Sequence, residues 1–94
     1  MLRKTVNLNA NGIGKLPDDK PVVYKILKGG TNMYTGTAKR GQVRQRISDH
    51  LPGGRDPVPG SKVQIEQMTS INEAQDKERR IISRSRPRYN KRGK

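Results

Sequence analysis

Glu78 is hard to explain as a scaffold residue, because it lies where a helix should bury its side chains. At about 100° per residue, a helix over this segment turns four apolar residues to one side, namely Ile71, Ala74, Ile81 and Ile82. Glu78 lies near the middle of that apolar arc. Burying an ionised carboxylate without a partner is costly, so Glu78 should be paired, bind a metal ion, or border a water-filled cleft.

Two tyrosines are placed where their hydroxyls can meet. Tyr24 lies in the β-branched stretch 21–27, and Tyr34 lies in the stretch 33–37, which follows a glycine-rich turn. Paired glycines between the two stretches permit the positive φ angles of a hairpin turn. The tyrosines are therefore expected on neighbouring antiparallel strands, with hydroxyls that can converge on one face.

An arginine and a histidine share one edge of a helix predicted over residues 42–51, whose apolar residues recur every four positions. Arg46 and His50 are also four apart, which places them about 40° from each other around the helix axis. They can therefore act as a pair. Arg44 lies near the opposite edge of the apolar stripe, so angular position alone does not separate the two arginines.

Periodicity and turn residues predict the elements that position these groups. Alternating or β-branched stretches predict strands at residues 3–10, 21–27, 33–37 and 62–68. Gly36 is expected to end the third of these strands. A capping box of Ser70 and Glu73 opens a second helix, which ends before Pro87 because the residue preceding a proline is disfavoured in the α region. Segments rich in Gly and Pro predict loops at residues 11–20 and 52–60.

These elements predict an α+β fold of order β-β-α-β-α, with or without the leading strand. The sheet is small and antiparallel-containing, has three or four strands, and is flanked by helices. A chain of 94 residues predicts one domain, 1–94, with an N-terminal extension (1–20), a core (21–90) and a basic tail (91–94). Only 29% of the residues are hydrophobic and neither Phe nor Trp occurs, so the core should be thin.

The charge balance points to a polyanionic partner. Lys and Arg number 21 against 8 Asp and Glu, which gives a formal net charge of +13. Nucleic acid, DNA or RNA, fits this charge better than a membrane, because no stretch approaches about 18 consecutive apolar residues. Charge alone would also suit a small ribosomal protein. The absence of cysteine and of an apolar signal segment predicts an intracellular, cytoplasmic protein. Whether its host is a bacterium or a virus stays open.

The tyrosine segments resemble the two motifs that name the GIY-YIG endonuclease family. The first motif is matched by Val22-Val23-Tyr24 and the second by Tyr34-Thr35-Gly36. Val22 replaces the first Gly of the family motif, and Thr35 replaces its usual aliphatic residue. The segment from Tyr34 to Arg46 is also somewhat longer than in common members, so the choice of Arg46 over Arg44 rests on the four-residue step to His50.

The resemblance covers residues 21–90 and extends to the later helices. The family places an Arg followed by a His or Tyr on its first helix, as Arg46 and His50 are placed here. Its Glu on a later helix corresponds to Glu78, and its Asn in a Pro-x-Tyr-Asn segment corresponds to Asn90. The tail is similar to that of the nuclease domain in the bacterial nucleotide-excision-repair incision subunit.

The resemblance implies that Glu78 holds one divalent cation, Mg²⁺ or Mn²⁺. A single carboxylate with waters and phosphate oxygens suits Mg²⁺, which keeps much of its water shell. The alternative for Glu78 is an ion pair with Arg79, Arg80 or a neighbouring helix.

The resemblance also makes Tyr24 the general base. Because an unperturbed phenol titrates near pH 10, nearby cations must lower its pKa: the metal ion, Arg46 and His50. His50 could instead take the proton by way of Tyr24 or a water. A lone histidine at a helix end is otherwise a favourable C-terminal charge.

The resemblance also implies that Arg46 binds phosphate and that Tyr34 and Asn90 form hydrogen bonds. Arg46 would hold the scissile phosphate with its planar fork, or else lie on a solvated helix face. Tyr34 would bond water or phosphate, or else pack in the hairpin. Asn90 would fix the geometry of the site, or else be an ordinary turn residue.

The function expected from these residues is metal-dependent DNA hydrolysis with low sequence specificity. Phosphate contacts without sequence preference are expected from Lys39, Arg40, Arg44, Arg79, Arg80, Arg84, Arg86 and Arg88. Two alternatives stay open: a catalytically inactive basic protein that binds DNA or RNA on the same fold, and a nuclease subunit that needs a protein partner or a second copy of itself.

Overall fold

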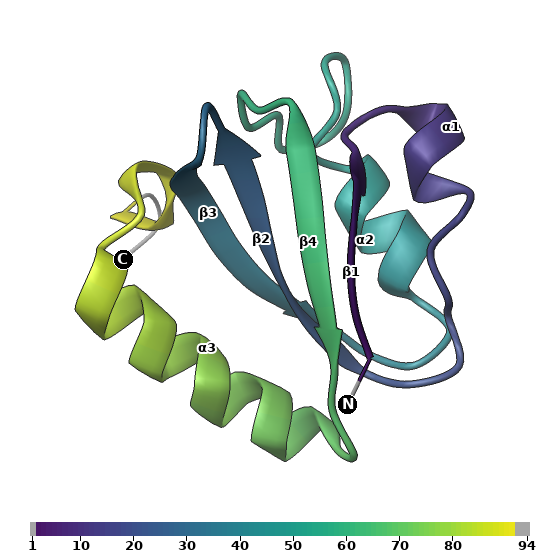
Figure 1. Cartoon of the computed structure of the whole chain (residues 1–94), viewed down its shortest axis with the longest axis vertical. Helices are drawn as coiled ribbons and strands as arrows, with labels where there is room; N and C mark the ends of the chain where they lie inside the picture. Colours follow the sequence, from purple (N-terminus) through teal and green to yellow (C-terminus); the bar gives the residue numbers. More distant parts are fainter. Residues whose placement is uncertain (1, 92–94) are drawn as a thin grey trace.

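The computed structural model describes residues 2–91 and consists of one four-stranded antiparallel sheet with helices on both faces (Figure 1). The strands are β1 (Arg3–Asn7), β2 (Val22–Lys28), β3 (Thr31–Ala38) and β4 (Lys62–Gln67), in the spatial order β1-β4-β2-β3. The helices are α1 (Ala10–Ile13), α2 (Val43–Ser48) and α3 (Ile71–Ser85), followed by a 3-10 turn, η1 (Arg88–Lys91). The predicted α+β class and small flanked sheet are confirmed. The leading strand does join the sheet, which therefore has four strands.

The β2–β3 hairpin forms as the paired glycines predict. Gly29 and Gly30 adopt φ angles of 57° and 85°, which L residues with side chains rarely adopt. The prediction that Gly36 ends the return strand is wrong, because β3 continues to Ala38. Gly36 instead lies in mid-strand, opposite Tyr24.

The N-terminal extension differs most from the sequence-based expectation. The first strand ends at Asn7, and the segment expected to be loop contains α1. Asn9 caps α1, since its Oδ1 accepts a hydrogen bond of 2.7 Å from the Gly12 N–H. A helix of four residues is too short to produce a helical period in the sequence, which is why it escaped prediction.

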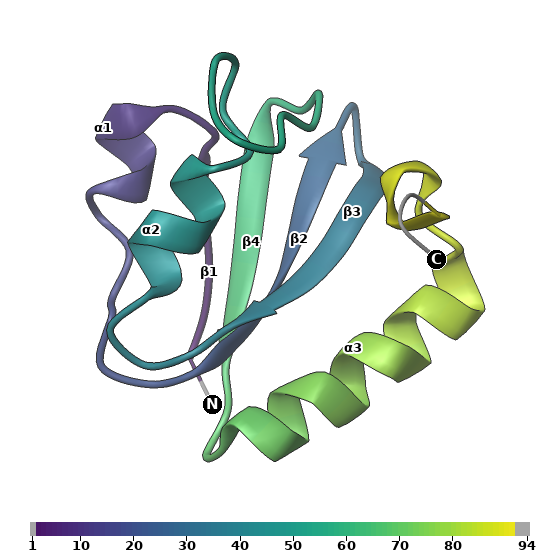
Figure 2. The same cartoon turned by 180° about the vertical axis from the view of Figure 1, so that it is seen from behind.

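Alternation along the strands divides the core between the two faces of the sheet. One face carries the larger cluster, which includes Val22, Tyr24 and Ile26 of β2 and packs against α1 and α2 (Figure 2). The other face carries a smaller cluster, in which Val23 packs with Ala74 and Ile81 of α3. Helix α3 contacts mainly β3 and β2, so the β1 and β4 side of this face stays uncovered (Figure 1).

Both ends of α3 follow the sequence. The Ser70 hydroxyl accepts from the Glu73 N–H at 3.2 Å, and the Glu73 carboxylate reaches back to Thr69 rather than to Ser70. The helix ends at Ser85, and Arg86 takes a left-handed conformation with φ 46° before Pro87. No helix described within residues 2–91 has the length and apolar character needed to cross a membrane.

Candidate active site

The Tyr24 side chain is buried in the larger core and ends at His50. Tyr24 is 1% exposed and His50 is 4% exposed, so both side chains are almost wholly buried. The Tyr24 hydroxyl lies 2.8 Å from Nε2 of His50, which comes directly after α2 and its C-cap Asp49. Strand β2 and the end of α2 thus bring together two residues that are 26 positions apart.

The other nitrogen of His50 determines the direction of this hydrogen bond. Nδ1 lies 2.9 Å from the backbone carbonyl oxygen of Asp56, which can only accept. Nδ1 must therefore carry the proton, and in neutral His50 the lone pair of Nε2 faces Tyr24. Burial lowers the pKa of His50, which favours this neutral form. Tyr24 accordingly donates its hydroxyl proton to His50.

The electrostatic surroundings keep Tyr24 protonated. Burial raises the pKa of the Tyr24 phenol above its usual range, and the neighbouring Tyr34 and Glu78 act in the same direction. Only the Arg46 guanidinium lowers it. The expectation that nearby cations depress the pKa of Tyr24 therefore does not hold for the protein alone, because burial outweighs Arg46.

Tyr34 lies beside this pair on β3. Its ring centroid is 4.7 Å from that of His50 and 6.1 Å from that of Tyr24, so the three rings form one cluster. The cluster fits because Gly36 has no side chain. A Cβ at Gly36 would approach the Tyr24 hydroxyl to 2.7 Å and the Tyr34 ring to 2.8 Å. The glycine of the second motif thus leaves the space in which the phenol of Tyr24 crosses β3.

Glu78, on α3, lines a cleft that Tyr34 of the same cluster also lines. A cleft of about 510 Å³ beside β3 is lined by Tyr34, Asp56, Glu78, Arg79, Ile82, Ser83, Tyr89 and Asn90. Glu78 is half-buried there, and its charge reaches Tyr24, whose pKa it raises. Glu78 thus borders a cleft, which is one of the positions expected for a carboxylate in the apolar arc.

The donor set of this cleft suits a hard, strongly hydrated cation. Among residues 2–91, no three His, Cys, Asp or Glu side chains are grouped so that they could enclose a metal ion. Mg²⁺ does not require such a group, since it is often bound through one or two carboxylates and retains several waters. Glu78, with Asp56 lining the same cleft, supplies oxygen donors of the kind Mg²⁺ and Mn²⁺ accept.

The two arginines of α2 have different surroundings. Arg44 donates from Nε to the backbone carbonyl of Leu16 at 2.8 Å, which ties α2 to the N-terminal extension. Arg46 is exposed and lies near enough to the Tyr24 hydroxyl to lower its pKa. Arg46 also lines a hollow with Lys39 between α2 and the start of α3. The contacts of Arg44 and Arg46 therefore distinguish the two arginines, which their angular positions on the helix did not.

Asn90 joins the C-terminal segment to the outer edge of β3. Its Oδ1 accepts from the Thr35 N–H at 2.7 Å, and its Nδ2 donates to the Thr35 carbonyl at 2.8 Å. The side-chain amide thus satisfies both backbone groups of Thr35, as a neighbouring strand would. This contact places η1, with Tyr89, against β3 at the mouth of the cleft.

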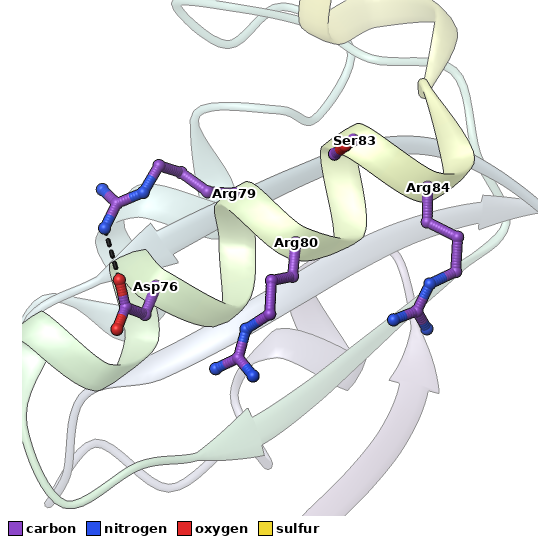
Figure 3. A pocket seen from close by; sticks show the side chains of 5 residues that line it. All are labelled: Asp76, Arg79, Arg80, Ser83 and Arg84. Atoms are coloured by element: carbon purple, nitrogen blue, oxygen red, sulfur yellow. Dashed lines mark hydrogen bonds and ion pairs between the residues drawn. The ribbon is translucent and has the colours of Figure 1, made fainter.

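The other basic residues predicted to bind phosphate lie on the surface. Lys39 and Arg40 are exposed in the turn before α2, and Arg86 and Arg88 are exposed around Pro87. Figure 3 shows the solvent side of α3, where Arg79 pairs with Asp76 while Arg80 and Arg84 extend together to the other side. Of the predicted basic tail, 92–94 lies outside the described residues.

One contributor to the site could not be found from the sequence. Asp56 lies in the Gly- and Pro-rich loop and acts through its backbone carbonyl, which every residue type possesses. The loop is fixed by hydrogen bonds from the Asp56 N–H to the Asp49 carbonyl, 2.8 Å, and from the Val58 N–H to the His50 carbonyl, 3.1 Å. Such contacts leave no residue-type signal to search for.

The cluster of Tyr24, Tyr34 and His50, with Glu78 across the cleft and Arg46 at its side, is thus the feature of this chain best suited to chemistry. Comparison with protein-family models, with curated proteins and with solved structures finds no match for this chain.

Proposed function

We propose that this chain is an endonuclease that hydrolyses DNA phosphodiester bonds with the help of a divalent cation and with little sequence specificity. The observation that carries the proposal is the hydrogen-bond chain from Tyr24 through His50 to the Asp56 carbonyl. It ends beside a cleft that contains a carboxylate. The resemblance to the GIY-YIG family supplies the reaction class.

The proposed role of Tyr24 and His50 is to remove a proton from the attacking water. Tyr24 accepts the proton from water as its own hydroxyl proton passes to Nε2 of His50. The phenol therefore never needs to exist as a free phenolate, which its burial disfavours. His50 accepts the proton because it is neutral, and the Asp56 carbonyl fixes the tautomer that can accept it.

Arg46 and Glu78 complete the proposed site. Arg46, an exposed cation beside Tyr24, would hold the scissile phosphate through its planar guanidinium. Glu78 would hold the Mg²⁺ or Mn²⁺ ion, which when bound supplies charge stabilisation for the phosphate and leaving oxygen. The exposed basic residues around the cleft provide backbone contacts that do not read sequence, which agrees with low specificity.

The test is cleavage of supercoiled plasmid and of single-stranded DNA by the full chain in Mg²⁺, in Mn²⁺ and in EDTA. Wild type should produce nicked or linear DNA only with a divalent cation. Glu78→Gln preserves the shape of the side chain and should lower the rate about 10³-fold, as loss of about 4 kcal/mol of metal-derived stabilisation implies. DNA binding, followed by gel shift, serves as the folding control.

Two outcomes would contradict the proposal. If wild type binds DNA but is inert with either cation and on both substrates, the chain does not cleave DNA by itself and the proposal fails. If Glu78→Gln cleaves as fast as wild type, the activity does not depend on the cleft carboxylate.

A further inference from the structure

A second polar groove lies on the opposite flank of α3 from the cleft. It is lined by residues of α3 and of strands β1, β2 and β4, and it has a volume of about 210 Å³. Its lining includes the apolar residues Val23, Ile65 and Ile81 and the polar residues Arg3, Lys25, Gln64, Glu66, Lys77 and Arg84. Of these polar residues, only Arg84 had a predicted role in binding.

The groove has an excess of positive charge. Four cations, Arg3, Lys25, Lys77 and Arg84, face one carboxylate, Glu66. Glu66 pairs with Arg3 at 3.4 Å and with Lys77 at 2.9 Å. Within residues 2–91, neither Lys25 nor Arg84 belongs to an ion pair. The groove therefore offers two cations whose charge is not neutralised by a partner.

The angular positions on α3 separate the groove from the cleft. Relative to Glu78, the cleft residues Ile82, Arg79 and Ser83 lie at about +40°, +100° and +140° around the helix axis. The groove residues Ile81, Lys77 and Arg84 lie at about −60°, −100° and −120°. Helix α3 thus lies between the two surfaces, with the cleft on one side and the groove on the other.

The exposed ridge of α3 connects the two surfaces with further cations. It carries Arg79, Arg80 and Arg84 against Asp76, which Arg79 already bonds. In Figure 3 the side chains of Arg80 and Arg84 extend to the same side of the helix, away from Arg79. Arg84 lines both the ridge and the groove, so positive charge continues from one to the other.

We propose that this groove binds the sugar–phosphate backbone of the nucleic acid that flanks the segment in the cleft. The flanking backbone crosses the ridge of α3 at Arg80 and Arg84 and contacts Lys25 and Arg3 on the open face of the sheet. The identity of the cleaved segment rests on the proposed function, but binding in the groove does not depend on cleavage.

Chemistry favours the phosphate backbone over the bases as the bound part. The polar lining contains no aromatic ring on which a base could stack. Lysine and arginine contact phosphate without reading sequence. The small volume also fits a strip of backbone rather than a folded partner.

The test compares a groove variant with a matched control of equal charge loss. The groove variant is Lys25→Gln with Arg84→Gln. The control is Lys15→Gln with Lys20→Gln, two exposed lysines of the segment between α1 and β2 that do not line the groove. Binding is measured in EDTA by fluorescence anisotropy between about 50 and 200 mM salt. The probe is a duplex of about 20 base pairs, which at about 3.4 Å per pair exceeds the 31 Å protein.

The groove variant should flatten the slope of log K against log salt by about two, since each lost duplex phosphate contact removes about 0.9. The control should keep the wild-type slope. Circular dichroism and thermal unfolding confirm that both variants fold.

Equal slopes for the groove variant and wild type would overturn the proposal. So would a groove variant that binds DNA normally but loses retention on phosphatidylserine vesicles, because the groove would then serve an anionic lipid surface. If the groove variant behaves as expected while wild type never cleaves DNA, the proposed function fails and the groove stands.

Discussion

The two edge strands of the sheet, β1 and β3, differ in length and in what lies along their outer edges. β3 has eight residues, and at Thr35 its outer edge is bonded by the Asn90 amide, which joins η1 to the strand. β1 has five residues and turns the polar side chains of Arg3, Thr5 and Asn7 outward. A short charged strand protects a sheet edge from pairing with other chains.

This difference explains why the candidate active site lies beside β3. Its edge is completed by side chains and by a C-terminal segment, and these leave a cleft that a paired strand would have filled. The β1 edge contributes to the sheet and to the open face, and no residue of β1 lines the cleft. Substitutions at β3 and its neighbours should therefore affect cleavage strongly, and matched substitutions at β1 residues other than Arg3 should not.

The largest expected effect is that of Tyr24→Phe on cleavage. The change removes one hydroxyl, and with it the proton donor to His50, so the rate should fall about 10²- to 10⁴-fold, the usual contribution of proton transfer. Plasmid cleavage under single-turnover conditions measures it. Thr5→Ala on β1 removes a hydroxyl of an exposed residue and should leave the rate unchanged. Equal rates for Tyr24→Phe and wild type would remove Tyr24 from the mechanism.

Gly36→Ala should cost stability as well as activity. The new methyl group would lie within 3 Å of both tyrosine rings, and overpacking of this kind costs roughly 1–3 kcal/mol. Urea unfolding measures the loss. Gly14→Ala is the matched control, because its Cβ would meet neighbours at 3.4 and 3.5 Å, and it should change stability by less than about 0.5 kcal/mol. If the two variants are equally stable, the tyrosines do not depend on Gly36 for their space.

Asn90→Ala should have a smaller effect on stability, roughly 1–2 kcal/mol, because it removes two hydrogen bonds at a partly solvated edge. The amide protons of Thr35 and its neighbours should exchange faster with solvent. Asn7→Ala removes one exposed hydrogen bond to Lys62 and should cost less than about 0.5 kcal/mol. Unaltered exchange at Thr35 in Asn90→Ala would show that the amide does not hold this edge.

The smallest effect is a dependence of stability on pH. Burial places the pKa of His50 in the folded chain below its ordinary value of 6.5. Below about pH 6.5 the unfolded chain therefore binds a proton that the folded chain does not, and stability falls until the folded-state pKa is reached. Urea unfolding of wild type and His50→Gln between about pH 7.5 and 5 measures the difference. A wild type no more sensitive to pH than His50→Gln would argue against a neutral, buried His50.

Local patterns in the sequence predicted much of the fold and identified the groups that meet at the site. The paired glycines, the Ser70 cap and Pro87 each act on the backbone within a few residues, so their consequences could be anticipated. Helix α1 was missed because four residues show no period. The role of Gly36 was predicted wrongly because the position requires a glycine only where the Tyr24 and Tyr34 side chains pack against it, and this packing is a tertiary contact.

The arrangement of the site could not be predicted from residue types alone. The choice between Arg44 and Arg46 depends on the Leu16 carbonyl, and the tautomer of His50 depends on the Asp56 carbonyl. Backbone groups of this kind carry no sequence signal. The protonated state of Tyr24 likewise follows from its burial, which depends on how the helices pack against the sheet.

The pH dependence of plasmid cleavage by wild type in Mg²⁺ tests the central proposal most directly, because His50 is the only histidine in the chain. If Tyr24 passes its proton to neutral His50, the cleavage rate should fall on the acid side with a midpoint below about pH 6.5. The imidazole NMR signals of His50 should titrate at the same pH. A chain that cleaves at no pH, or whose acid limb does not follow the titration of His50, would contradict the account.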